Sequence, residues 1–281
     1  MYLVRRDIVD RRGGSWHFTC SSMDGGTIYS SESALREAVR ALARFAPREL
    51  FAFNLTPGHD HLGFDARRRD AGRCASAYHR WLLPRSEARL DRSFPTAIRN
   101  RQHLRSAARY IVTQAARELF DVEHPALWSG SCFLDLVGAR HLPGFSLADS
   151  HGVDPSSFMQ PIGLPGPRLP ELTADEVRDL GGARVAAAAA AAAAADPALR
   201  GKSVSTMRAR RAAIDLALNV GTRVGEIAAA LGIHRSNVHS LRGQSDPDLV
   251  LATQRRLELE VCVARLLETG WDYDHWLNSP R

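Results

Sequence analysis

The chain has 281 residues, of which 44% are hydrophobic and 24% charged; these are globular proportions and exclude wholesale disorder. Its longest apolar run, residues 185–195, is mostly alanine and is shorter than the roughly 20 residues of a membrane-spanning helix, so no membrane association is expected. The net charge is +6. The N-terminus is too charged for a secretory signal and the four cysteines form no CxxC pair, and these two features predict a cytoplasmic protein with reduced thiols.

Basic residues gather in two separate segments, and all but one of them are arginine. Residues 65–117 hold thirteen arginines against four carboxylates, and residues 200–242 hold eight basic side chains against two carboxylates. A GC-rich genome would favour arginine over lysine, but the clustering needs a further reason. We therefore expect two surfaces for a polyanion, with nucleic acid first among the candidates.

The first half of the chain alternates strand-like and helix-like segments. In order, the patterns predict a strand at 16–21, a helix capped by Ser33 and stopped by Pro47, strands at 49–55 and 58–65, a helix at 70–83, a strand at 94–99 and a helix at 102–120. A turn of three residues, 56–58, joins the second and third strands, which implies an antiparallel pair. This order predicts a ferredoxin-like split βαβ sandwich of the α+β class, with helices on one face of an antiparallel sheet and the other face open.

The second half is predicted to form a separate, all-α domain. Residues 147–172 are rich in proline and glycine and are interpreted as a linker between domains at 1–146 and 173–281. Thr173, with Glu176 three residues later, has the pattern of a capping box at a helix start. The alanine tract at 186–195 favours helix but offers no large side chain to pack, so it is interpreted as a spacer without chemistry.

A helix-turn-helix is predicted at residues 224–243. Gly232 would occupy the turn and Ala228 the point where the two helices cross. Apolar side chains fill the core positions of the pattern: Ile227, Leu231, Ile233, Val238 and Leu241. The second helix, at 235–241, would present side chains to the major groove of duplex DNA, while arginines ahead of the motif hold the backbone. The expected DNA contacts are Arg235, Ser236, Asn237, His239 and Arg242 in the motif, and Arg208, Arg210 and Arg211 ahead of it.

Two other interpretations concern this half of the chain. The helix-turn-helix pattern also suits a helical hairpin that contacts another protein, although the local positive charge favours DNA. The amphipathic segment after it, at 249–267, is expected to be a helix that caps the domain or joins two copies as a homodimer.

Two histidines on the third predicted strand would make half of a metal site. His59 and His61 are two residues apart, so both imidazoles project from one face of the strand, while Asp60 between them projects from the other. An isolated His-x-His pair is more often two surface or hydrogen-bonded histidines, so the spacing is a weak indication by itself. If Asp60 is buried, its carboxylate needs a partner or a raised pKa.

Tyr110 is a candidate nucleophile on the last predicted helix of the first half. It lies off the apolar stripe of that helix, where a core tyrosine would be expected. The stripe comprises Leu104, Ala108, Ile111, Ala115 and Leu119. Gln114 follows Tyr110 by one turn, and its amide oxygen suits a hard cation such as Mg²⁺. Two imidazoles, an amide and a phenol would together make a site that polarises a phosphate and attacks it.

Four segments resemble one protein family in the same order. Residues 53–64, FNLTPGHDHLGF, resemble the strand-turn-strand of the single-tyrosine HUH transposases of the insertion-sequence-200 type, and residues 109–120, RYIVTQAARELF, resemble their tyrosine helix. Residues 16–29 resemble their first strand and turn, and residues 124–133 resemble the Trp-Ser-Ser segment that follows the helix. The resemblance covers about residues 10–145 and is greatest to the REP-associated tyrosine transposases, which often carry additional C-terminal sequence.

The resemblance implies a DNA strand-transfer enzyme. His59 and His61 correspond to the family's metal-binding histidines, Tyr110 to its nucleophile and Gln114 to its third, polar ligand, with Mg²⁺ or Mn²⁺ as the cofactor. The implied reaction is cleavage of single-stranded or hairpin DNA by the phenol, which leaves a 5′-phosphotyrosine and a free 3′-hydroxyl. Flanking phosphates would be held by the arginines just after the histidine strand: Arg67, Arg68, Arg69 and Arg73.

The chain departs from the family pattern in two places. Asp60 stands where relatives carry an apolar residue, and residues 88–94 lack the Gly-His-Leu-Trp-Gln-like stretch of relatives. The alternative function is therefore a catalytically inactive, domesticated transposase that acts as a DNA-binding regulator. A metal-dependent hydrolase unrelated to DNA ranks last, because it would leave both basic segments unexplained.

Overall fold

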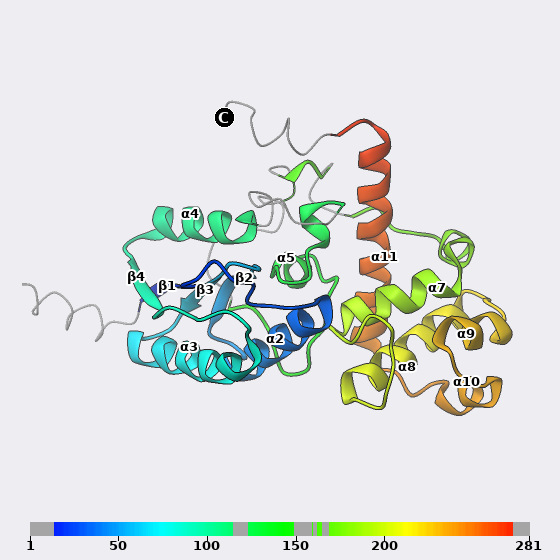
Figure 1. Cartoon of the computed structure of the whole chain (residues 1–281). Coiled ribbons are helices and arrows are strands. Elements are labelled where there is room, and N and C mark those ends of the chain that lie inside the picture. Colours follow the sequence, from blue (N-terminus) through cyan, green and yellow to red (C-terminus); the bar gives the residue numbers. More distant parts are fainter. Residues whose placement is uncertain (1–13, 115–122, 149–158, 160–161, 165–168, 272–281) are drawn as a thin grey trace, which may run out of the picture. The chain divides into compact units, whose positions relative to one another are not determined.

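A computed structural model describes residues 14–114, 123–148, 159, 162–164 and 169–271 of the chain. The chain forms two compact units, one of residues 1–133 and 143–162 and one of residues 134–142 and 163–281 (Figure 1). The first unit is built on an antiparallel sheet with helices and the second is helical, which confirms the predicted α+β class. No helix within the described ranges is long and apolar enough to cross a membrane.

The sheet of the first unit has the strand order β2-β3-β1-β4, and each neighbouring pair is antiparallel. The strands are β1 (Ser15–Ser21), β2 (Leu50–Leu55), β3 (His59–Asp65) and β4 (Phe94–Ile98). This is the order of a split βαβ sandwich, in which the third strand is inserted between the first and the second. Thr19, on the central strand β1, is paired with His61 on one side and with Phe94 on the other.

Helices lie on both faces of this sheet, whereas the sequence analysis predicted one open face. α2 (Glu32–Phe45) and α3 (Arg68–Leu82) pack together on one face, and α4 (Arg101–Val112) crosses the other, mainly over β2 and β3 (Figure 1). Buried Phe18, Leu62 and Phe64 fill the layer beneath α2 and α3. The α4 face stays partly uncovered at β4, whose first residues are exposed.

Two predicted helix boundaries in this unit were wrong. Ser31, not Ser33, caps α2, because its hydroxyl accepts a hydrogen bond from the Ala34 amide. The α-helix α4 ends at Val112, whereas the pattern predicted a helix to residue 120; residues 115–120 lie outside the described part of the chain. The other strands and helices of the unit agree with the predictions to within two residues. Shorter elements are the 3₁₀ helices η1 (Leu83–Arg85) and η3 (Pro125–Leu127), and α5 (Phe133–Leu136) where the chain leaves the first unit.

The second unit is built from α7 (Ala174–Ala192), α8 (Val204–Asn219), α9 (Val224–Leu231), α10 (Arg235–Leu241) and α11 (Pro247–Glu268). The predicted capping box is confirmed, since Thr173 and Glu176 each accept the backbone N–H of the other. α7 is kinked at Gly181, whose φ of 82° and ψ of 161° are accessible essentially to glycine alone. The Glu226 carboxylate accepts a hydrogen bond from the Gly182 amide at 2.8 Å, so an acidic side chain caps the half of α7 that carries the alanines.

The alanine tract lies in the core of this unit and is not the spacer that the sequence analysis predicted. Ala188, Ala189, Ala190 and Ala192 are completely buried, and α7 packs against both α8 and α11. Methyl side chains let helices approach closely, so the absence of large side chains is what permits this packing. The interpretation failed because an all-alanine stretch has no polar positions that would mark one face as buried.

Replacing Ala189 by leucine is expected to destabilise the protein by about 1–3 kcal/mol, because closely packed helices leave no space for the added side chain. Ala187 lies in the same tract but is exposed, so Ala187→Leu is the matched control and should change the free energy of unfolding by less than about 0.5 kcal/mol. Chemical denaturation of both variants measures the difference. Equally small effects at the two positions would contradict a packed tract.

Candidate functional site

β3 presents His59 and His61 to the sheet face that α4 crosses, as strand alternation predicted. Their ring centroids are 4.6 Å apart, and the two ring planes are nearly perpendicular at 87°. His61 is almost completely buried, while His59 is partly exposed. The pair therefore opens toward solvent on the His59 side.

Asp60 projects to the opposite face and has the partner that a buried carboxylate needs. The Tyr29 hydroxyl donates to Asp60 Oδ1 at 2.7 Å and lies 2.7 Å from the hydroxyl of Tyr78 on α3. Burial raises the pKa of Asp60 to about 7, and the hydrogen bond from Tyr29 opposes that rise. The unusual residue between the histidines is thus accommodated in the α3 layer, and it is compatible with an ordered histidine pair on the other face.

A third imidazole, His17 of β1, joins the histidine pair. Its Nε2 lies 3.0 Å from Nδ1 of His61, and the two ring centroids are 5.1 Å apart. Burial lowers the pKa of His17 to about 4 and that of His61 to about 3, so both rings are neutral at neutral pH. His17 was not predicted from the sequence. Along β1, His17 alternates with buried Trp16 and Phe18, so the sequence pattern places it on the less buried face of the strand. Its position diagonally across from His61 depends on how β1 pairs with β3, which the sequence pattern does not show.

α4 carries Tyr110 onto this cluster. The Tyr110 ring centroid lies 5.2 Å from that of His61 and 6.1 Å from that of His17, with an edge-on geometry in both pairs. Buried Asn54 of β2 ties the helix to the sheet, because its side-chain amide donates to the Ile111 carbonyl at 3.1 Å. The helix turn that bears Tyr110 is therefore fixed to the strand next to β3.

Gln114 lies just beyond the end of α4 and reaches the same cluster. Its amide nitrogen is 3.3 Å from Nε2 of His59, and the side chain is largely buried. The structure therefore brings together the four side chains that the sequence analysis selected for chemistry: His59, His61, Tyr110 and Gln114.

The donor set of this cluster is suited to hold a divalent cation. Nε2 of His61 is buried and has no hydrogen-bond partner within the described residues, which is uncommon for a polar atom in a protein interior. A neutral imidazole nitrogen in that situation is suited to bind a cation, since its other nitrogen is already held by His17. His59 and the Gln114 amide supply further ligand atoms beside it.

A second group that could hold a metal ion lies in the helical unit. Ligand atoms of His141, Asp246 and Asp248 all lie within 4.8 Å of one another. Asp246 already has two structural contacts, because it pairs with Arg208 at 2.7 Å and caps α11 through the Asp248 amide. The sequence analysis did not point to this group.

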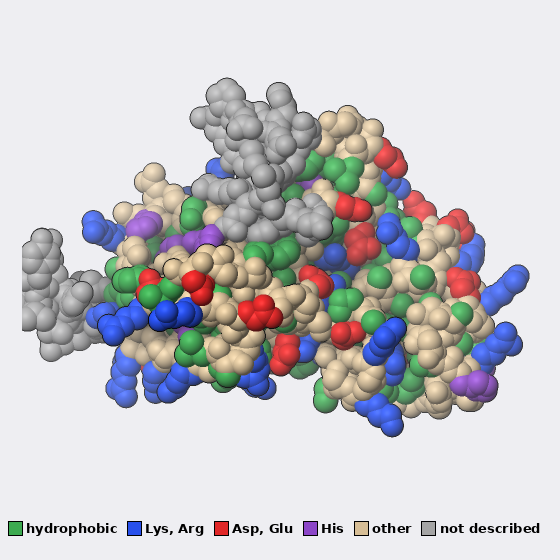
Figure 2. Space-filling view, in the orientation of Figure 1, with side chains coloured by type: hydrophobic (Ala, Val, Ile, Leu, Met, Phe, Trp, Pro, Cys, Tyr) green, Lys and Arg blue, Asp and Glu red, His purple; other side chains and the backbone are tan. Residues whose placement is uncertain are grey.

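The arginines that the resemblance assigned to flanking phosphates lie at the other end of β3. From His59 the strand runs six residues to Asp65, roughly 20 Å, before the chain reaches Arg67 at the start of α3. Arg68, Arg69 and Arg73 lie in the first turns of α3 and Arg67 is its N-cap residue; Figure 2 shows basic side chains gathered over this part of the molecule. These four arginines are therefore not brought together with Tyr110.

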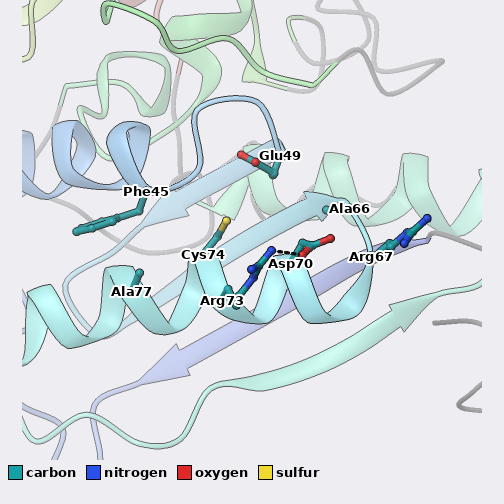
Figure 3. Close-up of a pocket in the computed structure, with 8 residues that line it drawn as sticks. All are labelled: Phe45, Glu49, Ala66, Arg67, Asp70, Arg73, Cys74 and Ala77. Atoms are coloured by element: carbon teal, nitrogen blue, oxygen red, sulfur yellow. Dashed lines mark hydrogen bonds and ion pairs between the residues drawn. The ribbon is translucent and has the colours of Figure 1, made fainter. Parts of the chain in front are cut away.

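Two of these arginines line an open hollow beside α3. Figure 3 shows Arg67, Asp70 and Arg73 among the residues that line it, and Asp70 pairs with Arg73. The hollow has a volume of about 540 Å³, and Glu49 adds a second carboxylate to its lining. Because both signs of charge are present, this hollow is less suited to an anion than the number of arginines suggests.

Other arginines follow the helix of Tyr110 itself. Arg101, Arg105 and Arg109 are spaced four residues apart on α4, so they share one face, and all three are exposed. Arg109 directly precedes Tyr110. From the sequence these residues were expected only as part of the basic segment, although their helical spacing was a signal that could have identified them.

α9 and α10 form the predicted helix-turn-helix in the second unit. Gly232 adopts the left-handed conformation in the turn, with φ of 60°, and Ile227, Leu231 and Val238 are buried between the helices. Asp215 of α8 fixes the segment after α10, because its carboxylate accepts hydrogen bonds from the backbone amides of residues 243 and 245 at 2.7 and 3.1 Å. The second helix is thus held at both ends.

The predicted DNA contacts of this unit fall into two groups. Arg235, Ser236, Asn237, His239 and Arg242 are all exposed. The arginines ahead of the motif instead make contacts within the unit, since Arg208 pairs with Asp246 and Arg210 donates to the carbonyls of Leu199 and Gly201. Arg211 is half-buried. The exposed group is therefore better placed to meet DNA than the arginines of α8.

Neither a protein-family model nor a curated protein matches the chain. The chain is similar to a solved structure of a REP-associated tyrosine transposase bound to a REP hairpin, with 22% sequence identity and a TM-score of 0.34. That similarity covers 43% of this chain and 77% of the other.

Proposed function

We propose that the first unit is a transposase-like, metal-dependent tyrosine nuclease and strand transferase for single-stranded or hairpin DNA. The observation that carries the proposal is the Tyr110 ring edge-on to His61 at 5.2 Å, within the cluster that also contains His59 and Gln114. The ordered sequence resemblance to the HUH transposases supports the same function. In this proposal, the helix-turn-helix of the second unit finds the site by binding duplex DNA.

Each residue of the cluster has a role in the proposed reaction. The Tyr110 oxygen attacks the scissile phosphorus and loses its proton, while the bond from phosphorus to the 3′-oxygen breaks and that oxygen gains a proton. The products are a 5′-phosphotyrosine and a free 3′-hydroxyl. Attack by a 3′-hydroxyl reverses these bond changes and releases the tyrosine, so strand transfer exchanges one phosphate ester for another. His59, His61 and Gln114 would hold Mg²⁺ or Mn²⁺, which supplies Lewis-acid polarisation of the phosphate when bound.

The contacts to flanking phosphates are assigned to two sets of arginines. The α4 face with Arg105 and Arg109 adjoins Tyr110 and suits the phosphates nearest the cleaved bond. The α3 arginines, Arg67, Arg68, Arg69 and Arg73, would reach only DNA that extends along β3 and past its end. We therefore expect the α4 set to affect cleavage more strongly than the α3 set.

Detection of a covalent adduct tests this function. The full chain is incubated with Mn²⁺ or Mg²⁺ and with single-stranded and hairpin DNA labelled at one end, followed by denaturing electrophoresis. A 3′-label should remain with the protein and a 5′-label should leave on a fragment with a free 3′-hydroxyl, and removal of the metal should prevent both. Absence of an adduct with either metal would support the alternative, a DNA-binding regulator, for which the departure at Asp60 is the motivating feature.

Replacing Asn237 by alanine is expected to lower affinity for the preferred duplex about tenfold and to relax the preference at one base pair. An exposed asparagine on a recognition helix can bind an adenine edge with both its donor and its acceptor. Selection from a random duplex library identifies the preferred sequence, and repeating it with the variant measures the change. Asn219→Ala, at an exposed position at the end of α8, is the matched control. Unchanged preference in Asn237→Ala would contradict base reading by α10.

A further inference from the structure

β4 presents an exposed aromatic ring on the sheet face that carries the tyrosine site. Phe94 is 60% exposed, and it is the one aromatic side chain among the large exposed hydrophobic residues of the described ranges. It pairs with Thr19 of β1, which in turn pairs with His61 of β3, so the three residues share one face of the sheet. A single apolar residue elsewhere on the surface needs no explanation, but an exposed phenylalanine on the sheet face of the tyrosine site does.

Phe94 lies close to the site, and within the described residues the helix on this face of the sheet packs mainly elsewhere. Cross-strand partners lie about 5 Å apart, so two steps place Phe94 roughly 10 Å from His61. α4 packs mainly over β2 and β3, and β4 begins with three exposed residues. A ligand that reaches Tyr110 along this side of the sheet would therefore pass over the Phe94 ring.

The charge on this side of the sheet favours a polyanion. Exposed Arg92 lies two residues before Phe94 and next to exposed Asp91, while exposed Arg99, Arg101 and Arg105 lie past the other end of β4 and along α4. Arginines suit a chain of phosphates, and an exposed ring on the same face of the sheet suits the aromatic bases that such a chain carries.

We propose that Phe94 is a stacking platform for an unpaired nucleobase of the DNA strand that Tyr110 attacks. The inference rests on the proposed function and adds a binding subsite to it. Stacking requires an exposed, flat ring, and every base offers a π-face, so the subsite tolerates different sequences. Bases within a duplex are already stacked on each other, so the platform favours unpaired DNA next to the tyrosine.

The test compares two probes in the Tyr110→Phe background, where no cleavage disturbs binding. One probe is an oligo-dT of about 12 nucleotides, and the other is an abasic strand of the same length and charge. At one fixed salt concentration, Phe94→Ala should lower oligo-dT affinity about tenfold and leave abasic-strand affinity within about twofold. Leu83→Ala removes an apolar side chain that is 53% exposed at the end of α3, and this matched control should change neither affinity.

A second variant gives a spectroscopic readout. Phe94→Trp should restore oligo-dT affinity, and its added fluorescence should be quenched by oligo-dT but not by the abasic strand. If Phe94→Ala loses affinity equally for both probes, or loses none for oligo-dT, the stacking platform is wrong and Phe94 has another role, such as contact with a protein.

The adduct assay on the wild type is scored separately. An adduct together with unchanged oligo-dT binding by Phe94→Ala refutes the platform alone, whereas base-dependent binding without an adduct refutes the nuclease alone.

Discussion

Tyr110→Phe is expected to reduce DNA cleavage to background and to eliminate the covalent adduct. The substitution removes the hydroxyl oxygen that the proposed reaction places on phosphorus and retains the ring that packs edge-on against His61 and His17. A nucleophile that forms the intermediate has no substitute in the site, so the loss should reach about three orders of magnitude or more.

Three measurements separate a chemical effect from a structural one in this variant. The free energy of unfolding, the affinity for Mn²⁺ and the affinity for oligo-dT should each stay close to the wild-type values, because the ring contacts remain. Cleavage is followed with the end-labelled hairpin and single-stranded probes. If Tyr110→Phe still forms an adduct, another side chain is the nucleophile and the assignment of Tyr110 is wrong. If it loses metal and DNA binding as well, Tyr110 has a structural role.

Relations within one strand or one helix were predictable from the sequence, whereas the contact of Tyr110 with His61 was implied by the family resemblance. Strand alternation alone places His59 and His61 on one face, and Gln114 reaches the same cluster although α4 ends at Val112, before it. What the pattern could not supply was the pairing between elements. His17 is diagonal to His61 only because β1 and β3 align His17 with Gly63 and Thr19 with His61.

The tolerance of Asp60 depends on the same kind of long-range contact. Tyr29 is 31 residues from Asp60 in the chain, and Tyr78 comes from a helix that follows the strand. A sequence pattern shows that a carboxylate at this position needs a partner, but it does not show where the partner is. Asp60 is therefore weaker evidence for an inactive protein once its hydrogen-bond partners in the fold are known.

A count of basic residues along the chain does not show where those residues lie in the fold. The residues at 65–117 form one cluster in sequence, yet β3 and the layer structure separate the arginines of α3 from those of α4. Net charge predicted a polyanion, whereas the fold shows that the α3 arginines lie away from Tyr110, past the far end of β3. Similarly, the exposed residues of α10 were predictable from the motif, but the internal contacts of Arg208 and Arg210 were not.

His17→Phe is expected to weaken Mn²⁺ binding at the histidine cluster by about 10- to 100-fold, the range measured when a residue that orients a metal ligand is removed. The reason lies in the proton on His61. Nε2 of His61 is buried without an acceptor among the described residues, so a proton there would be an unsatisfied buried donor. The proton therefore belongs on Nδ1, which donates to Nε2 of His17 at 3.0 Å and leaves the Nε2 lone pair for a cation.

Phenylalanine keeps an aromatic ring beside Tyr110 but accepts no hydrogen bond, so it removes the orienting contact with little loss of packing. Calorimetric titration with Mn²⁺ measures the affinity, and the imidazole nitrogen shifts in NMR spectra of the metal-free protein report the His61 tautomer. His17→Gln retains an acceptor and should recover part of the affinity. Asp248→Asn removes a carboxylate charge from the other candidate metal group and should leave this affinity unchanged. If His17→Phe binds Mn²⁺ as well as the wild type, or if His61 keeps its tautomer without His17, then the third histidine does not orient the second.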